Sequence, residues 1–539
     1  MEGTIMERKE YLAVLPLVAI LIMSPWPFTL AKAQMETIPR GGTLKVAYIE
    51  PAQLNPVRGG GFPMAIPATQ IFASLLQYDG NFKPQPYMAK KWEVSPDDRT
   101  YTFYLENGAT FHDGKPVTSA DVAFSVETVM KNHHLGPVMF RAVEKVETPD
   151  LYTVVFNLKH PYPAFMAAHH PWFLPILPKH IYGEGEFRKH PANVKPVGSG
   201  PFKFVEWKKG QHIILDRYEN YFRKGKPYLD RIIIEFIPDP AARTLVLETG
   251  ATHILPCGTI SAEDARRLEK MPQMALTEKG YEAMGARLMF SINLRKPPLS
   301  DLKVRKALAH ALDKDFIAKE IFLDFGKPAT GPFHYVGPFY NPDVRRYEYD
   351  IHKANQLLDD AGYKRGADGI RFDLSVDYQP GRAEYRIICE YLREQFKKVG
   401  INCTLRASPD MPSWAAKIGE WNYEITLDFP ADFADPVIGI ERNYISTNIK
   451  KLLWTNHMGY VNPEVDRLFA QAQAEKNFEK RRNLYYRVQE ILVEELPIIW
   501  IQDLGMYTVY SRDCEGLPVS VWGVMNPFDT VYLRTGKSK

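Results

Sequence analysis

The sequence predicts an α/β fold, because stretches with the two-residue periodicity of β-strands alternate with stretches of helical periodicity. Alternating apolar residues mark strands at 101–105 and 152–158, and apolar residues at helical spacing follow at 304–312 and 354–361. Residues 372–405 place a helical pattern between two strand patterns, as in a β-α-β unit. The 539 residues are enough for about three domain-sized units.

The first predicted strand follows Gly41-Gly42-Thr43, with Leu44, Val46 and Tyr48 at alternating apolar positions. A loop with prolines comes next and ends in a run of three glycines at 59–61. No G-x-x-x-x-G-K-[ST] pattern occurs there, and no G-x-G-x-x-G follows a strand, so phosphate binding is unsupported. We expect a plain flexible loop.

Residues 92–124, WEVSPDDRTYTFYLENGATFHDGKPVTSADVAF, have the order strand, turn, strand, turn and helix start. Residues 101–105 alternate as one face of a half-buried strand, and Asn107-Gly108 supplies a turn. Thr118 and Asp121 have the spacing of a capping pair before an apolar helix. None of these residues carries reactive chemistry, so the module is predicted to be structural.

Two further helices are predicted in the second half of the chain. One begins at Ser300-Asp301, and the other begins at Asp350 and ends at Gly362, where a glycine suits a helix C-terminus. Both show apolar residues at helical spacing, which indicates one buried face for each helix.

The pattern at 372–405 has a consequence for ligand binding. It joins a strand, a helix that ends at Gly400, and a second strand. Such a crossover makes its strands parallel, and in open α/β sheets ligands bind at the carboxyl ends of strands. The loop 378–382 lies at such an end, and the acidic loop DFPADFADP lies at another if the strand 423–427 is also parallel. We therefore expect the two loops to share one crevice.

The N-terminus has the pattern of a cleaved secretory signal. Arg8 and Lys9 precede an apolar run from Tyr11 to Met23, and Ala31-Lys32-Ala33 has small residues at the two expected positions. The run is shorter than the roughly 20 residues that span a bilayer, so a permanent anchor is the weaker interpretation. The net charge of +3 is too small to indicate a nucleic-acid partner.

Residues 92–124 resemble the signature of the extracytoplasmic solute-binding proteins of the peptide and nickel type, family 5 of the receptors that serve ABC importers. The stretches NLRKPPLSDLKVRKALAHALDK and YDIHKANQLLDDAGY are similar to recurrent motifs of that family. The resemblance implies a two-lobed α/β fold with an additional subdomain in the first lobe. It also implies a monomeric periplasmic receptor that closes around a peptide or related amine-bearing solute and delivers it to a membrane permease, with no catalytic activity and no cofactor.

The resemblance and the patterns together predict how the chain is divided. The predicted parts are a signal peptide at 1–33, the first part of lobe I at 34–71, the additional subdomain at 72–195, the second part of lobe I at 196–289, lobe II at 290–497, and a C-terminal return to lobe I at 498–539.

The stretch 431–436, ADFADP, resembles the family's motif whose aspartate holds the α-amino group of a bound peptide, which implies that role for Asp432. An ammonium that leaves water needs a fixed charged partner. Arg382 is the candidate for the ligand's carboxylate, because a guanidinium grips two oxygens, although the family's arginine in this loop is displaced here. Tyr48, Trp414 and Phe433 are candidates for aromatic walls, with core packing as the alternative for each.

Other solutes of the same family remain alternatives, namely a nickel chelate, haem, an opine or an oligosaccharide, although Asp432 argues against neutral sugars. A secreted hydrolase is the alternative from another class, but the sequence shows no nucleophile elbow and no metal motif. The histidine pairs at 133–134 and 169–170 are adjacent residues that do not share a helix face, so no metal site is predicted.

The four cysteines, Cys257, Cys389, Cys403 and Cys514, form no C-x-x-C pair. No cysteine precedes Cys257, so the lipid-attached cysteine of many receptors in this family has no candidate here. An oxidising compartment permits disulfides, but a bridge between two moving lobes would lock them. Only Cys257 with Cys514 and Cys389 with Cys403 are then tolerable, and the second pairing is disfavoured because it joins a mid-helix residue to the next strand.

Overall fold

The computed structural model describes residues 38–59, 61–379 and 383–534. The predicted signal peptide and Arg382 lie outside the described residues. Within these ranges, no helix combines the length and the apolar composition that crossing a bilayer requires.

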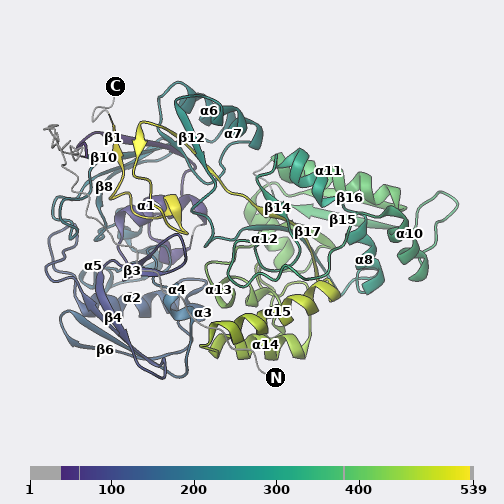
Figure 1. Ribbon diagram of the computed structural model, residues 1–539, viewed down its shortest axis with the longest axis horizontal. Helices are drawn as coiled ribbons and strands as arrows, with labels where there is room; N and C mark the ends of the chain where they lie inside the picture. The colour runs from purple at the N-terminus through teal and green to yellow at the C-terminus, as the bar shows by residue number, and fades with distance from the viewer. Residues whose placement is uncertain (1–37, 60, 380–382, 535–539) are drawn as a thin grey trace, which may run out of the picture. The chain divides into compact units, whose positions relative to one another are not determined.

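The first strand is central in a mixed seven-stranded sheet (Figure 1). It pairs in parallel with β10 and β11 and buries Leu44, Val46 and Tyr48, as its sequence pattern predicts. Helices α6 (Pro240–Glu248) and α7 (Ala262–Glu269) pack beside β11 and β12. The strand order is β12 (Met274–Thr277), β19 (Thr508–Ser511), β11 (Ile254–Leu255), β1 (Thr43–Tyr48), β10 (Arg231–Phe236), β9 (His212–Arg217) and β8 (Phe202–Lys208).

Between β1 and β8 the chain forms a separate antiparallel sheet of four strands. Their order is β4 (Ala89–Val94), β5 (Thr100–Leu105), β7 (Thr153–Leu158) and β6 (Val143–Asp150). Helix α2 (Ser119–Asn132) packs on this sheet and begins with the predicted capping box, in which the Thr118 N–H donates to Asp121 over 2.9 Å. The strand, turn and helix order read from 92–124 is confirmed.

The second large sheet has six strands, in the order β14 (Gly326–Pro328), β18 (Ile498–Leu504), β13 (Arg287–Ile292), β17 (Ile425–Asp428), β15 (Phe372–Tyr378) and β16 (Ile401–Ala407). Strand β15 is parallel to β16 and to β17, so both the β-α-β unit and the orientation of β17 are confirmed. The longer helices of this part are α8 (Leu302–His310), α10 (Ile351–Asp360), α11 (Ala383–Lys398), α12 (Met411–Gly419), α14 (Pro463–Ala474) and α15 (Phe478–Glu495).

The chain passes from one large sheet to the other between β12 and β13, and it returns between β18 and β19. The return is later than the residue 498 that the sequence suggests, because β18 pairs with β13 and β14 and belongs to the six-stranded sheet. An apolar strand pattern indicates burial, but it does not indicate which strand lies next to it.

The cysteines all lie in the described part of the chain, and neither of the two tolerable disulfides forms. Cys389, Cys403 and Cys514 are buried free thiols. Cys389 and Cys403 pack in the core of the six-stranded sheet, where burial raises the pKa of Cys403 to about 12. These side chains act as small apolar residues of the cores.

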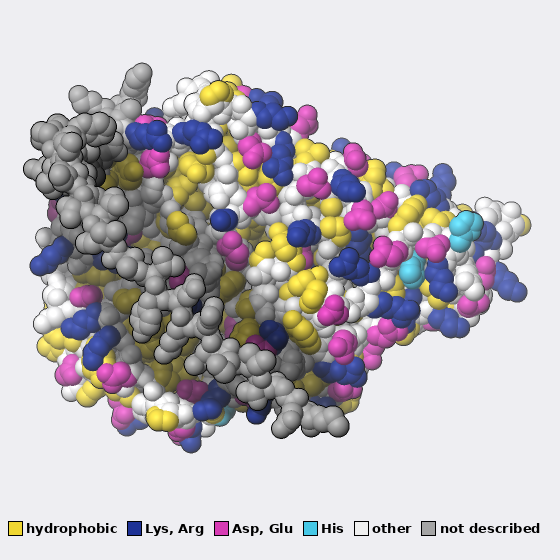
Figure 2. All heavy atoms as spheres, in the orientation of Figure 1, with side chains coloured by type: hydrophobic (Ala, Val, Ile, Leu, Met, Phe, Trp, Pro, Cys, Tyr) yellow, Lys and Arg dark blue, Asp and Glu magenta, His cyan; other side chains and the backbone are white. Residues whose placement is uncertain are grey.

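The surface mixes charges of both signs. Figure 2 shows Lys and Arg interspersed with Asp and Glu over the face in view, outside the residues drawn in grey. This mixing agrees with the net charge of +3, and the face in view presents no basic field of the kind that binds a polyanion.

A buried ion pair joins helix α15 to the loop after β17. The Arg481 guanidinium donates to both carboxylate oxygens of Asp435, each over 2.8 Å, and its Nε donates to the Ala472 carbonyl. Asp435 also caps the short helix α13 (Pro436–Gly439), since its side chain accepts the Val437 N–H. Both side chains are less than a tenth exposed. Each buried charge is therefore compensated only while the other residue is present.

We expect Arg481→Met to lower the free energy of unfolding by about 3–5 kcal/mol, because the variant leaves the Asp435 carboxylate buried without its cation. The neighbouring Arg482, which pairs with Glu479 at the surface, is the matched control, and Arg482→Met should change stability by less than about 0.5 kcal/mol. Urea denaturation followed by tryptophan fluorescence measures both. Equal losses in the two variants would contradict the special role of the buried pair.

Candidate functional site

The candidate site lies where β17 and β15 end. Tyr378 is opposite Leu427 in a parallel register, so the loops that follow the two strands leave the same edge of the sheet. This is the edge at which open α/β sheets bind ligands. Most of the loop after β15 lies outside the described residues, including the predicted carboxylate ligand Arg382.

The loop after β17, residues 429–435, is held by the segment that precedes β13. The Asp432 N–H donates to the Met284 carbonyl over 2.7 Å, and the Ala434 N–H donates to the Ala283 carbonyl over 2.6 Å. Phe433 and Ala434 have left-handed backbone conformations, with φ of 53° and 66°. Such conformations are costly for residues other than glycine, so the surrounding contacts define the course of this loop.

Asp432 already has a protein cation as its partner. Its Oδ2 lies 3.3 Å from Nη2 of Arg287 and accepts the His334 N–H over 3.1 Å. Arg287 also holds Asp503 over 2.8 Å, so one buried guanidinium serves two carboxylates. Burial raises the pKa of Asp432, and Arg287 opposes that shift. The acid that the family motif implies for a ligand ammonium is therefore engaged within the protein, and its contact with a ligand remains a prediction.

A small cavity beside Asp432 has a volume of about 20 Å³. That space is enough for about one water molecule and is far below the size of small-molecule sites. The residues that line it are Phe82, Glu282, Phe333, His334, Gly337, Pro338, Phe339, Asp432, Ala434, Asp435, Pro436 and Ile440.

Tyr48 and Trp414, two of the three predicted aromatic walls, are core residues. Tyr48 is 1% exposed and its hydroxyl donates to the Phe62 carbonyl over 3.0 Å. Trp414 is completely buried and its Nε1 donates to Thr426 over 3.0 Å. For both residues the structure favours the core-packing alternative, since their side chains present almost no surface to a ligand.

Phe433, the third predicted wall, belongs to a series of four rings that we call the aromatic arc: Phe429, Phe62, Trp172 and Phe433. The centroid distances along the arc are 6.5 Å from Phe429 to Phe62, 5.9 Å from Phe62 to Trp172, and 5.9 Å from Trp172 to Phe433. These are distances at which aromatic pairs attract each other. Phe62 and Trp172 come from the first half of the chain, and Phe429 and Phe433 come from the loop after β17.

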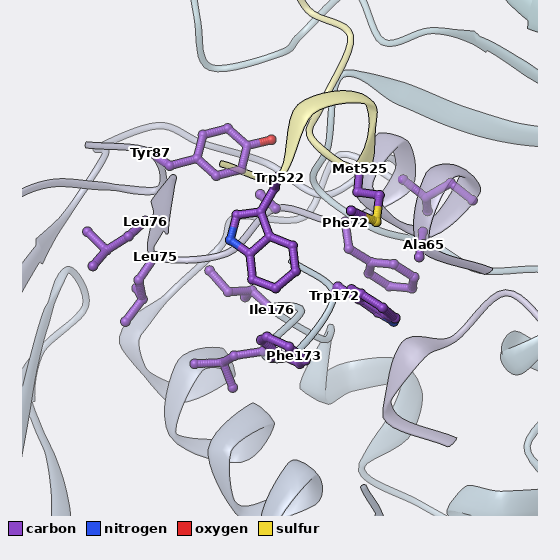
Figure 3. Packing of buried hydrophobic residues seen from close by; sticks show 14 of the residues in the cluster. Ala65, Phe72, Leu75, Leu76, Tyr87, Trp172, Phe173, Ile176, Trp522 and Met525 are labelled. Carbon is purple, nitrogen blue, oxygen red and sulfur yellow. The ribbon is translucent and has the colours of Figure 1, made fainter. Parts of the chain in front are cut away.

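The first-half side of the arc rests on a rigid aromatic core. Figure 3 shows Trp172 and Phe173 beside Trp522, whose ring centroid lies 6.0 Å from that of Trp172 and 5.4 Å from that of Phe173. Trp522 comes from the C-terminal segment and is completely buried. Residues far apart in the sequence thus fix the position of Trp172.

Sequence reasoning missed two charged residues next to the arc, Asp428 and Arg442. Asp428 is the last residue of β17 and is 1% exposed, and burial raises its pKa to about 6. The Arg442 guanidinium lies 5.8 Å from the centre of the Phe433 ring. Asp428 was visible in the sequence as the first acid of DFPADFADP, whereas Arg442 belongs to no motif and carries no comparable signal.

Of the adjacent pair His133 and His134, only His133 is buried. Burial lowers the pKa of His133, and the charges of His134 and Arg442 lower it further. In the part of the chain that the structure describes, no group of three or more His, Cys, Asp or Glu side chains is arranged to hold a metal ion.

We expect Arg287→Met to lower the melting temperature more at pH 8 than at pH 5. Burial raises the pKa of Asp432, and without Arg287 nothing at that guanidinium's position opposes the rise, so the folded state binds more protons than the unfolded state above about pH 4. The stability of the variant must then fall as the pH rises. Calorimetry between pH 5 and pH 8 measures the difference.

Adding Asp432→Asn to Arg287→Met provides the control, because it removes one of the two stranded charges and should restore part of the lost melting temperature at pH 8. A loss that is independent of pH in the single variant would show that Arg287 stabilises the protein by packing rather than by charge.

Comparison with known proteins gives a consistent result. The family description "Bacterial extracellular solute-binding proteins, family 5 Middle" matches residues 83–451. The oligopeptide-binding protein AppA of Bacillus subtilis is 27% identical over 505 residues, which cover 88% of this chain and 89% of that protein.

Two solved structures are similar over nearly their whole length. The periplasmic binding protein DppA from Helicobacter pylori, in complex with the peptide STSA, has a TM-score of 0.79 and 26% identity and covers 92% of this chain and 99% of its own. NikZ from Campylobacter jejuni, in complex with Ni(L-His), has a TM-score of 0.79 and 25% identity, with coverages of 90% and 97%. The likeness confirms the predicted two-lobed α/β fold.

Proposed function

Because the chain belongs to family 5 of the bacterial extracellular solute-binding proteins, we propose that it captures a peptide or related amine-bearing solute for an ABC importer. The observation that carries this proposal is the aromatic arc at the carboxyl end of β17, in which rings from both halves of the chain meet beside charged side chains. Relatives that bind an oligopeptide or the peptide STSA support the choice of solute.

We place lobe I at 34–71 and 196–286, with the additional subdomain at 72–195, and lobe II at 287–504, because β13 begins at Arg287 and belongs to the six-stranded sheet. The return to lobe I then takes residues 505–539, so that β18 stays with its partners in the six-stranded sheet. Ligand binding works by closure: contacts from both lobes are complete only in the closed form, so the ligand shifts the population toward that form.

The loop after β17 provides the ligand contacts of lobe II in this proposal. Phe433 contributes as part of the aromatic arc, and Asp432 stays a candidate for the ligand's ammonium even though Arg287 already holds it. Arg382 stays a candidate from the sequence alone.

The protein's partners in this role are the solute and the permease subunits of the importer, and the receptor acts as a monomer in the periplasm. No catalytic step is required of it, because capture and release use only binding energy that differs between open and closed forms.

Native mass spectrometry of the mature protein purified from its own host tests the proposal. We expect adducts whose masses, after release under denaturing conditions, correspond to peptides. A recovered nickel chelate, haem or opine would replace the peptide by one of the alternatives within the family. Turnover of a recovered compound, abolished by one Ser or His substitution, would favour a hydrolase.

Closure can be tested away from the ligand, through Arg141. Its Nη1 lies 3.1 Å from the Glu441 carboxylate and donates to Gln473 over 2.9 Å. Arg141 therefore joins the additional subdomain to lobe II. We expect Arg141→Ala to weaken solute binding about 3- to 10-fold, because it removes a contact of about 1 kcal/mol from the closed form alone.

Lys145→Ala is the matched control, since Lys145 pairs with Glu147 of its own strand. Isothermal titration calorimetry gives the affinities, and small-angle scattering with and without solute gives the degree of closure. Unchanged affinity in Arg141→Ala would contradict a role for this contact in closure.

A further inference from the structure

We propose that Asp428 and Arg442 hold the two charged ends of a zwitterionic solute, with Asp428 receiving its ammonium and Arg442 its carboxylate. The inference rests on the proposed receptor function and specifies the residues and the charge pattern of the ligand. It transfers the roles that the family motif implies for Asp432 and Arg382 to two other side chains.

The Asp428 carboxylate has one satisfied and one unsatisfied oxygen. Its Oδ1 accepts the Phe429 N–H over 2.7 Å and the Trp454 indole N–H over 3.3 Å. Its Oδ2 is buried and accepts no hydrogen bond from any residue that the structure describes. A buried oxygen without a donor is unfavourable, and buried polar atoms in proteins are almost always satisfied. A ligand ammonium would supply the missing donor and the compensating charge.

Arg442 lacks an anionic partner. Its Nε donates to the Gly439 carbonyl over 3.2 Å, and no carboxylate in the described part of the chain forms an ion pair with its guanidinium. Burial lowers the pKa of Arg442 to about 10, so the side chain stays protonated at neutral pH. A partly buried guanidinium without an acid is well suited to take two oxygens of a ligand carboxylate.

Each of the two residues neighbours one ring of the aromatic arc, Asp428 along the chain and Arg442 in space. Asp428 directly precedes Phe429, the first ring of the arc, and Arg442 lies against Phe433, the last ring. The charges influence each other but form no direct ion pair. An acid and a guanidinium that lie near the same rings but form no ion pair with each other fit a solute that carries an ammonium, a carboxylate and an apolar body.

Asp432 is the competing acid, and its electrostatic surroundings are different. Arg287 and the His334 N–H already hold its carboxylate, whereas no cation among the described residues forms an ion pair with Asp428. An ammonium at Asp432 would have to share the carboxylate with Arg287 and would lie close to that positive charge. Asp428 therefore provides the better binding position for a ligand cation.

The alternative is a purely structural pair, in which Arg442 rotates and binds Asp428 directly. In that case the two residues would stabilise each other and would have no effect on ligand selection. The two hypotheses make different predictions. If the residues bind the ligand, the variants change the selectivity for charged peptide ends, and if the pair is structural, they do not.

The test uses random tripeptide to pentapeptide libraries in three forms: with free ends, N-acetylated, and C-amidated. Binding is measured by native mass spectrometry and by the rise in melting temperature. We expect the wild type to bind free-ended peptides at least tenfold more tightly than either blocked form, because each block removes a charge-assisted contact.

Asp428→Asn should abolish the preference for a free amine while the preference for a free carboxylate remains. Arg442→Met should do the reverse, and the exposed Arg467→Met should keep both preferences. Asp432→Asn decides between the two candidate acids for the amine. If a variant fails to fold, Asp428→Glu and Arg442→Lys replace it, and each should weaken only its own preference. Melting temperatures of all variants without peptide report folding.

Loss of amine preference in Asp432→Asn, with Asp428→Asn unchanged, would overturn the proposal. So would unchanged preferences in both Asp428→Asn and Arg442→Met, particularly if the double variant is more stable than either single one, as a structural pair requires. A wild type that binds no peptide in any form would instead reject the peptide receptor function itself, and the inference with it.

Discussion

The anchoring of the loop after β17 is the constraint on which the candidate site depends. Backbone hydrogen bonds tie Asp432 and Ala434 to the segment at 283–284, and the Arg481 pair ties Asp435 to helix α15. Gly439 completes the anchor, since a Cβ there would lie 2.3 Å from the carbonyl oxygens of Ala431 and Asp432. The segment at 283–284 lies between β12 and β13, on the first crossing between the sheets. The loop is therefore tied both to the crossing and to the six-stranded part, and it holds Phe433 against Trp172.

Three aspartates within eight residues show how partners decide the role of a side chain. Asp435 has a bidentate arginine and a capping position and is structural. Asp432 shares Arg287 with Asp503, and Asp428 has an unsatisfied oxygen. A buried charge without a partner is unfavourable, so Asp428, whose carboxylate is incompletely hydrogen-bonded, is the acid that can still accept a ligand's cation. The sequence places the three acids in one loop and distinguishes only Asp432, by the family motif, without showing which partners each acid has.

Much of the fold could be predicted from local pattern. The capping box at Thr118, the helix start at Asp350 and the β-α-β unit at 372–405 follow from short-range spacing, and each is present. The place of β18 could not be predicted in this way, because its run of apolar residues would suit either large sheet. The cysteines were equally ambiguous: their spacing permitted two bridges, but their burial in the cores leaves them as apolar side chains.

The sequence by itself determined the family, the α/β class and the loop in which ligand contacts are sought, because these depend on residue order and periodicity. Only the tertiary structure decided which side chains in and around that loop are available. Tyr48 and Trp414 became core, Asp432 acquired Arg287, and Phe433 joined rings from the first half of the chain. Whether a side chain is free to contact a ligand depends on its neighbours in space, and some of these come from distant segments, as Arg287 does for Asp432 and Trp172 for Phe433.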